Sequence, residues 1–234
     1  MNRVTAIALM LAAALSAPAH GQAFQCRPPR TIPMPPPVKP DGPRIAAPLT
    51  GYTLAISWSP EFCRGADRLA NPLQCSGQIG RFGFVLHGLW PEAAGSAPQW
   101  CAPNLRPTAA DLQANLCMTP VPWLLEHEWA KHGSCMAATP RAYFAAEQAL
   151  WRGLNLPDAD RLSRRDGLTA GELRQAFATR NPQIPRRAIG ILIGHDGWLR
   201  EVRLCYSLRR QPSACPARTY GPADQVPLKI WRGL

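Results

Sequence analysis

The sequence predicts an α+β domain with a central antiparallel sheet, flanking helices and stapling disulfides. Four apolar segments have strand character, and the last two are separated by a tight-turn signal. Helix-start signals lie between the strands at irregular intervals, and eight cysteines follow an export-type N-terminus. Because strands and helices do not alternate regularly, these observations favour an α+β architecture over a doubly wound parallel sheet.

The predicted strands are rich in branched and aromatic residues, which suit a half-buried sheet. They are YTLAISW (52–58), RFGFVLH (81–87), AIGILIG (188–194) and WLREVRLCYSL (198–208). Between the last two, Asp196-Gly197 favours a tight turn, so we expect an antiparallel hairpin there.

The predicted helices are marked by their first residues. A helix is expected over Thr108–Leu116, and another where Thr139 precedes a first-turn proline. Thr169 with Glu172 forms a capping-box pattern that opens a helix towards Arg180.

Three segments divide the chain. Residues 1–23 resemble a secretory signal, with an early cation, a short apolar run and small residues before a cleavage point, for which Ala23 is favoured over Ala19. Residues 24–48 form a proline-rich, extended arm, and residues 49–234 form the folded domain. No later stretch approaches transmembrane length. We therefore expect a monomeric periplasmic or secreted protein, free of the membrane after signal removal.

The cysteines and the charge both fit an exported protein. None of the eight cysteines sits in a C-x-x-C pair, which favours four disulfides over zinc or redox chemistry. The formal net charge is +11 and is carried mainly by arginine. A basic exported protein often binds a polyanion. Nucleic acid, anionic lipid and acidic polysaccharide all remain candidates at this point.

The stretch EHEWAKHGSC (126–135) gathers ionisable residues on a predicted helix. His127 and His132 are five apart, about 140° around a helix, whereas the H-E-x-x-H zinc pattern needs a spacing of four. We therefore expect no metal and no other cofactor. His127 with Lys131 and Glu128 with His132 are instead stacked one turn apart. Taken alone, the stretch also suits an ordinary solvated helix face.

A second histidine site favours chemistry over that alternative. In FVLHGLWPE (84–92), His87 is expected at the end of a strand, where Gly88 breaks it and Pro91 turns the chain. Two histidines at separate sites, with a lysine and a glutamate near one, suit phosphodiester cleavage at a ribose. One imidazole removes the 2′-OH proton and the other protonates the leaving 5′-oxygen. DNA lacks that hydroxyl, so RNA is the expected substrate.

FVLHGLWPE and WLLEHEWAKHGSC (123–135) resemble the two active-site segments of the T2 family of endoribonucleases. SWSPEFC (57–63) and LREVRLCYS (199–207) resemble flanking signatures, and the resemblance extends roughly from Gly51 to Cys215. It implies a ribonuclease T2-like fold and a role for each of seven residues. These are His87 as general acid, His132 as general base, Glu128 and Lys131 as transition-state stabilisers, His127 as a phosphate ligand, Trp90 as a base-stacking ring and Glu92 as a base-edge contact.

The resemblance also implies two disulfides, Cys101–Cys135 and Cys205–Cys215. Local spacing favours Cys63–Cys75, which leaves Cys26 with Cys117. The predicted activity is metal-independent cleavage of single-stranded RNA through a 2′,3′-cyclic phosphate to a 3′-phosphate. The alternative is a non-catalytic polyanion-binding or cytotoxic interaction protein on the same scaffold. The proline-rich arm has no counterpart in the family pattern.

Overall fold

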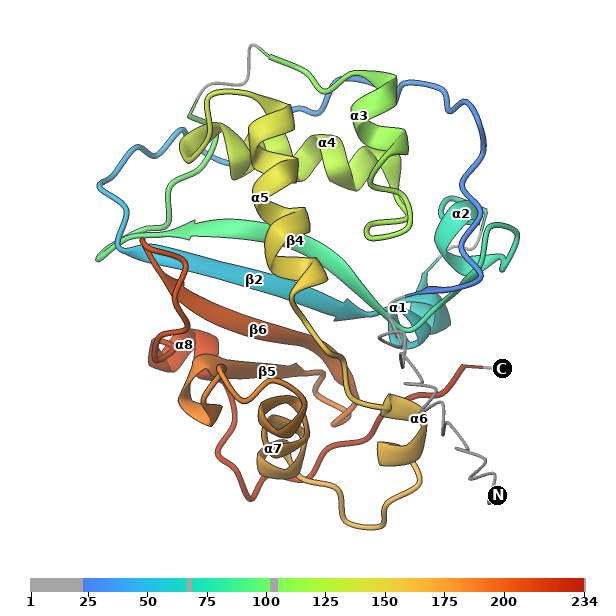
Figure 1. The fold of residues 1–234 in the computed structure, drawn as a ribbon, viewed down its shortest axis with the longest axis vertical. Helices are drawn as coiled ribbons and strands as arrows, with labels where there is room; N and C mark the ends of the chain where they lie inside the picture. The colour runs from blue at the N-terminus through green and yellow to red at the C-terminus, as the bar shows by residue number, and fades with distance from the viewer. Residues whose placement is uncertain (1–22, 67–68, 102–104, 234) are drawn as a thin grey trace, which may run out of the picture.

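The computed structural model describes residues 23–66, 69–101 and 105–233. Within this part of the chain, a four-stranded antiparallel sheet of order β4-β2-β6-β5 lies at the centre (Figure 1). Its strands are β2 (Gly51–Trp58), β4 (Phe84–Glu92), β5 (Ile189–Ile193) and β6 (Leu199–Ser207). A short pair, β1 (Ala23–Phe24) with β3 (Arg81–Phe82), lies apart from it. The α+β prediction is confirmed. All but the last residue of the predicted signal segment lie outside the described residues.

The helices after Thr108, Thr139 and Thr169 begin where the capping signals predicted. The full set of helices is longer and comprises α1 (Ser59–Gly65), α2 (Pro72–Cys75), α3 (Ala109–Gln113), α4 (Pro122–Lys131), α5 (Pro140–Arg152), α6 (Ala159–Leu162), α7 (Ala170–Arg180) and α8 (Ala217–Tyr220), with 3₁₀ turns at Gly133–Cys135 and Arg186–Ala188. Thr108 and Thr169 each complete a capping box, and the Thr139 side chain accepts from the backbone N–H of Ala142. The hairpin of β5 and β6 is also present, with Gly197 at φ +80° in its turn.

One prediction about β4 was wrong. The strand was expected over 81–87, but it runs from Phe84 to Glu92 and passes through the residues expected to break it. Ile56 pairs with Leu86 and Ala55 with Gly88, so His87 is the extra residue of a bulge in mid-strand. Strand β4 is the edge strand of the sheet, so its outer side has no neighbouring strand. Pro91 lacks a backbone N–H but removes no interstrand hydrogen bond on that side.

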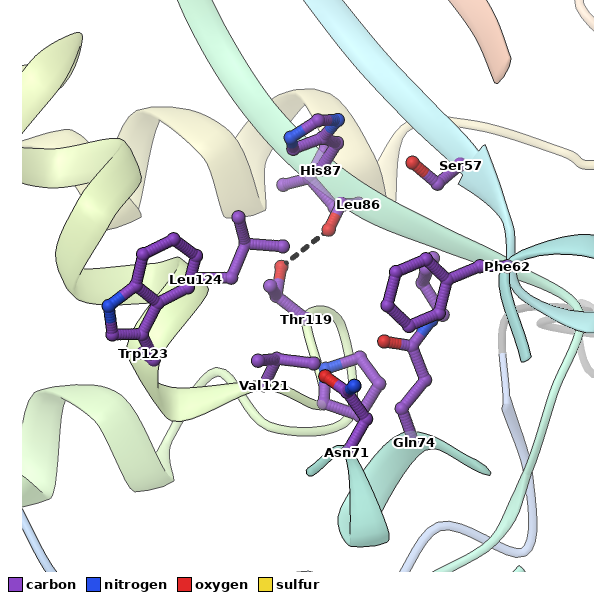
Figure 2. Close-up of a pocket in the computed structure, with 12 residues that line it drawn as sticks. Ser57, Phe62, Asn71, Gln74, Leu86, His87, Thr119, Val121, Trp123 and Leu124 are labelled. Atoms are coloured by element: carbon purple, nitrogen blue, oxygen red, sulfur yellow. Dashed lines mark hydrogen bonds between the residues drawn. The ribbon is translucent and has the colours of Figure 1, made fainter. Parts of the chain in front are cut away.

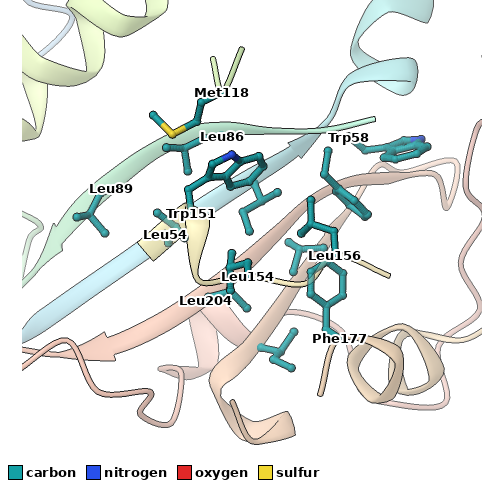
Figure 3. Packing of buried hydrophobic residues seen from close by; sticks show 14 of the residues in the cluster. Leu54, Trp58, Leu86, Leu89, Met118, Trp151, Leu154, Leu156, Phe177 and Leu204 are labelled. Atoms are coloured by element: carbon teal, nitrogen blue, oxygen red, sulfur yellow. The ribbon is translucent and has the colours of Figure 1, made fainter. Parts of the chain in front are cut away.

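The two faces of the sheet differ in polarity. Leu54, Leu89 and Leu204 pair laterally and face the apolar core, where Trp151 of α5 and Phe177 of α7 also pack (Figure 3). Strand alternation places the next lateral rows on the other face. Those rows are Ser57 with Val85 and Glu201, Ala55 with Gly88 and Arg203, and Thr53 with Trp90 and Cys205. This second face carries the polar groups of the candidate site.

Four disulfides fasten the loops to this frame. The bonded pairs are Cys26–Cys117, Cys63–Cys75, Cys101–Cys135 and Cys205–Cys215, which match the expected pairs. The proline-rich arm is held to the surface by hydrogen bonds as well. Gln113 of α3 donates to the carbonyls of Pro29 and Arg30, and Arg106 donates to that of Pro35. Among the described residues, every helix is too short or too polar to cross a bilayer.

Candidate active site

His87 lies between two carboxylates. Its Nδ1 is 2.8 Å from Oε2 of Glu201 on β6, and its Nε2 is 3.5 Å from Oε1 of Glu128 on α4. Both carboxylates are almost fully buried, at 6% and 4% side-chain exposure, whereas the His87 side chain is 32% exposed. The bulge in β4 therefore presents a partly open imidazole whose two nitrogens each face an acidic group.

Helix α4 reaches this position because β4 has a glycine opposite it. A Cβ at Gly88 would lie 2.0 Å from Oε2 of Glu128. Just beyond the C-terminus of the helix, a Cβ at Gly133 would lie 2.7 Å from the rings of Trp129 and Tyr143. Distances this short exclude any side chain without a shift of the neighbours. Gly88 therefore allows α4 to approach the sheet closely, and Gly133 allows the turn after α4 to pack against Tyr143 of α5.

The outer edge of β4 is anchored to α5. The backbone N–H of Leu89 donates to the Tyr143 hydroxyl at 3.1 Å and to Oε1 of Glu147 at 3.0 Å. Both side chains are buried. These bonds satisfy an edge-strand donor that would otherwise lack a partner, and they hold the bulge in place.

Trp90 contacts both histidines of the predicted acid/base pair. Its ring centroid is 5.2 Å from that of His87 and 5.6 Å from that of His132. Its Nε1 donates to Oε2 of Glu128 at 2.7 Å. The indole therefore holds the carboxylate of Glu128 and contacts both imidazoles.

The histidines of EHEWAKHGSC contact different surroundings. His127 stacks on Trp123 at 5.0 Å and meets the edge of Trp100 at 5.5 Å. His132 ends α4, and its buried Nδ1 has no hydrogen-bond partner in the described part of the chain. Within the same residues, no group of three or more His, Cys, Asp or Glu side chains is arranged to hold a metal.

The surroundings shift the pKa values of His87 and His132 in opposite directions. Burial works against the charged form of His87, but Glu128 and Glu201 outweigh it and raise the pKa of His87 to about 9. Burial, Lys131 and His127 together lower the pKa of His132 to about 3. At mild pH one ring is therefore protonated and the other neutral, as acid/base catalysis requires.

The pKa values of the two carboxylates beside His87 also shift in opposite directions. Burial raises the pKa of Glu128 to about 7, against the opposing effects of His87 and Trp90. Burial also opposes ionisation of Glu201, but His87 and Arg203 outweigh it and lower the pKa of Glu201. Arg203 donates from Nε to Oε1 of Glu201 at 2.7 Å, and its guanidinium lies 5.2 Å from the Trp90 ring centroid.

Glu201 and Arg203 were missed as site residues from the sequence. The signal that could have found them lies in LREVRLCYS, where two charged residues two apart interrupt an apolar strand. Period-two alternation puts them on one sheet face, opposite Val202 and Leu204. That strand was recognised, but nothing in the sequence placed it beside His87.

The other predicted residues are distributed around this centre. Lys131 Nζ is paired with Oδ2 of Asp41 at 2.7 Å. The Glu92 carboxylate accepts from Thr53 at 2.7 Å and from Arg218 at 2.6 Å, two residues along β4 from Trp90. Its two oxygens are thus engaged within the protein, and a contact with a base stays a prediction.

A cavity of about 170 Å³ opens beside His87. Figure 2 shows the His87 ring at one end, with Trp123 and Phe62 on opposite sides. Most of its lining is apolar, and the Thr119 hydroxyl donates to the Leu86 carbonyl at 2.8 Å. A flat, mainly apolar ring fits such a space.

Comparison with solved structures identifies the fold. Solved structures of T2-type ribonucleases have the same fold: RNase NT in complex with 5′-AMP covers 79% of this chain at TM-score 0.61 and 20% identity, with 98% of its own chain matched. Trichomaglin, described as an S-like ribonuclease, covers 78% at TM-score 0.60 and 18% identity, with 98% of its chain matched.

Sequence comparison finds similarity to the ribonuclease T2 family. The ribonuclease T2 family model matches residues 50–163. A "probable ribonuclease" of Haemophilus influenzae is 34% identical over 194 residues, 76% of this chain and 65% of the relative. A ribonuclease of Aeromonas hydrophila is 43% identical over 84 residues, 36% of each chain. The chain thus spans less than two thirds of these relatives. The predicted resemblance to the ribonuclease T2 family is confirmed over residues 50–163, which contain both histidine segments.

Proposed function

We propose that the protein is a metal-independent endoribonuclease that cleaves single-stranded RNA through a 2′,3′-cyclic phosphate to 3′-phosphate ends. One observation carries the proposal: two imidazoles that both contact Trp90 have pKa values displaced in opposite directions, to about 9 for His87 and about 3 for His132. A reaction that needs an acid and a base at once requires this difference.

In the first step, neutral His132 removes the proton from the ribose 2′-OH. The resulting oxygen attacks the adjacent phosphorus, the P–O5′ bond breaks, and protonated His87 gives its proton to the leaving 5′-oxygen. In the second step the roles reverse: His87 activates water, and His132 protonates the departing 2′-oxygen. Each proton transfer typically contributes about 10²–10⁴ in rate.

Charge on the phosphoryl oxygens is met by donors on α4. Lys131 and His127 lie one turn apart and together suit a phosphate. Burial raises the pKa of Glu128, and in its protonated form this group can donate a hydrogen bond to a phosphoryl oxygen while Glu201 continues to hold the charge on His87. The tightly packed Gly88 contact keeps that donor in place.

The substrate bases are assigned to two places. The cavity beside His87 suits the base on the leaving side, since its walls are apolar and partly aromatic. Trp90 and Glu92 are proposed for the base on the other side of the scissile phosphate. RNA as the substrate is supported by the relatives' names and by RNase NT, which was solved with 5′-AMP.

The organisation of the chain remains part of the proposal. Residues 1–23 are proposed as a signal peptide, 24–48 as the arm and 49–234 as the catalytic domain, acting as a monomer in the periplasm or outside the cell. Four disulfides support an oxidising compartment.

One assay tests the activity. The purified oxidised protein is incubated with RNA and with single-stranded DNA, each in EDTA, and the product ends are analysed. We expect cyclic phosphate ends from RNA and no cut in DNA. Absence of RNA cleavage would favour the alternative, a polyanion-binding or cytotoxic protein on this scaffold. Cleavage that EDTA abolishes would also contradict the proposal.

A further inference from the structure

We propose that Asp41 is a built-in competitor for the phosphate position: the N-terminal arm seats its carboxylate on Lys131, where a substrate phosphate oxygen would bind. The inference rests on the proposed function, because it takes Lys131 as a phosphate ligand. It concerns the arm, which has no counterpart in the family pattern.

The contact has the features of anion binding. Oδ2 of Asp41 lies 2.7 Å from Nζ of Lys131, and Oδ1 accepts from Nε1 of Trp100 at 3.2 Å. The two oxygens thus have different donors, as two oxygens of a phosphate would. His127 is near the same group, in edge contact with the Trp100 ring. Lys131 lowers the pKa of Asp41, so the carboxylate is charged in mild acid.

The arm delivers Asp41 to this place by a fixed attachment. Ile45 and Gln99 form an antiparallel bridge with two backbone hydrogen bonds of 3.0 Å, and the Gln99 amide donates to the Pro43 carbonyl at 2.8 Å. The next residue, Trp100, donates from its backbone to the Lys131 carbonyl at 2.7 Å. The arm, the Gln99 loop and the end of α4 are therefore joined around one lysine.

The ion pair between Asp41 and Lys131 is weak enough for a phosphate to displace it. The Asp41 side chain is 51% exposed, and exposed ion pairs contribute little because water and salt screen them. A phosphate diester inside a chain of phosphates can displace such a carboxylate. We therefore expect the arm to weaken substrate binding by about 2- to 5-fold, a range typical of exposed pairs, rather than to block the site.

A role for Asp41 in positioning Lys131 predicts the opposite change in the kinetic constants. If Asp41 positioned Lys131 for catalysis, its loss would lower kcat or raise KM. If it competes with phosphate, its loss lowers KM and leaves kcat unchanged. The direction of the change separates the two.

The test compares Asp41→Asn with Asp160→Asn. Asn keeps an oxygen for the Trp100 donor but removes the charge. Asp160 is an exposed aspartate of α6 that pairs with Arg164, so its variant controls for a loss of one negative charge. For Asp41→Asn we expect a KM for oligoribonucleotides about 2- to 5-fold lower, unchanged kcat, and a similar fall in the inhibition constant of inorganic phosphate. Asp160→Asn should match the wild type.

Unchanged KM and phosphate inhibition in Asp41→Asn, or a lower kcat, would overturn the inference. Inorganic phosphate binding is also measured without RNA, by the shift of the His127 ring resonances in NMR titrations. Tighter phosphate binding by Asp41→Asn in that experiment supports the inference even for a chain that cleaves no RNA, and equal binding rejects it. Failure of the proposed function is thereby kept separate from failure of this one.

Discussion

At the residue scale, the reactive character of the site comes from the surroundings of each histidine rather than from the histidines themselves. His87 gains a proton because two buried carboxylates face its nitrogens. His132 loses one because it is buried near cations. In the proposed mechanism, charge and burial thus give two chemically identical rings opposite tasks.

The first prediction concerns Glu201→Gln. His87 must be protonated to act as the acid, so the alkaline limb of the kcat/KM profile follows its pKa of about 9. Removing the anion at Nδ1 lowers that pKa, and the alkaline limb should move to lower pH. We also expect activity to fall by about tenfold or more, a part of the usual contribution of proton transfer.

The same variant has a consequence for stability. Since the folded-state pKa of His87 is raised, its protonation contributes stability that is present below about pH 6.5 and lost as pH rises through about 9. Glu201→Gln should reduce that contribution at pH 6. NMR titration of His87 and thermal unfolding measure both effects. Glu172→Gln, which preserves the helix cap of α7, is the control. An unmoved alkaline limb would refute the role given to Glu201.

At the element scale, the site depends on how closely α4 approaches β4. The bulge at His87 turns the imidazole towards the helix, and Gly88 removes the side chain that would keep the helix away. Neither feature contributes a reacting atom, yet both set the distances between His87, Glu128 and Trp90.

The second prediction follows from that approach. In Gly88→Ala, the new Cβ would lie 2.0 Å from Glu128 Oε2, so the helix or the carboxylate must shift. We expect activity to fall by about 10²-fold or more, the cost of a small misplacement of catalytic groups. Gly95→Ala is the matched control, since a Cβ there meets nothing within 4 Å. Near-normal activity of Gly88→Ala would show that the contact is not needed.

The elements also show what the sequence could and could not predict. Capping residues and the Asp196-Gly197 turn are local signals, so the helix starts and the β5–β6 hairpin were predicted correctly. The continuation of β4 through Pro91 was missed because it depends on the strand being at an edge, which is a property of the whole sheet. Glu201 and Asp41 were missed for the same reason: 114 and 90 residues separate them from their partners His87 and Lys131.

At the scale of the whole molecule, one polar sheet face and one helix end make the site, and disulfides fasten the surrounding loops. Cys101–Cys135 joins the loop that carries Trp100 to the turn after α4. The chain has a formal net charge of +11, which provides long-range attraction for a polyanion.

The third prediction uses that charge. If the protein contacts two or three phosphates of single-stranded RNA, kcat/KM should fall by about tenfold between roughly 50 and 200 mM salt. The cause is that each counterion released on binding gains less entropy at higher salt, which weakens binding and raises KM. A dinucleotide with a single phosphate should show a smaller slope. Equal slopes for the two substrates would mean that binding does not extend along the RNA.

The roles of the two histidines are tested most directly with an RNA dinucleotide in which sulfur replaces the bridging 5′-oxygen. A thiolate leaves without protonation, so this substrate does not need an acid. On the oxygen substrate, His87→Phe and His132→Phe should each lose about 10²–10⁴ in rate. On the sulfur substrate, we expect His87→Phe to recover to within about tenfold of the wild type and His132→Phe to stay impaired. Recovery of His132→Phe instead, or of neither variant, would contradict the assignment of His87 as acid and His132 as base.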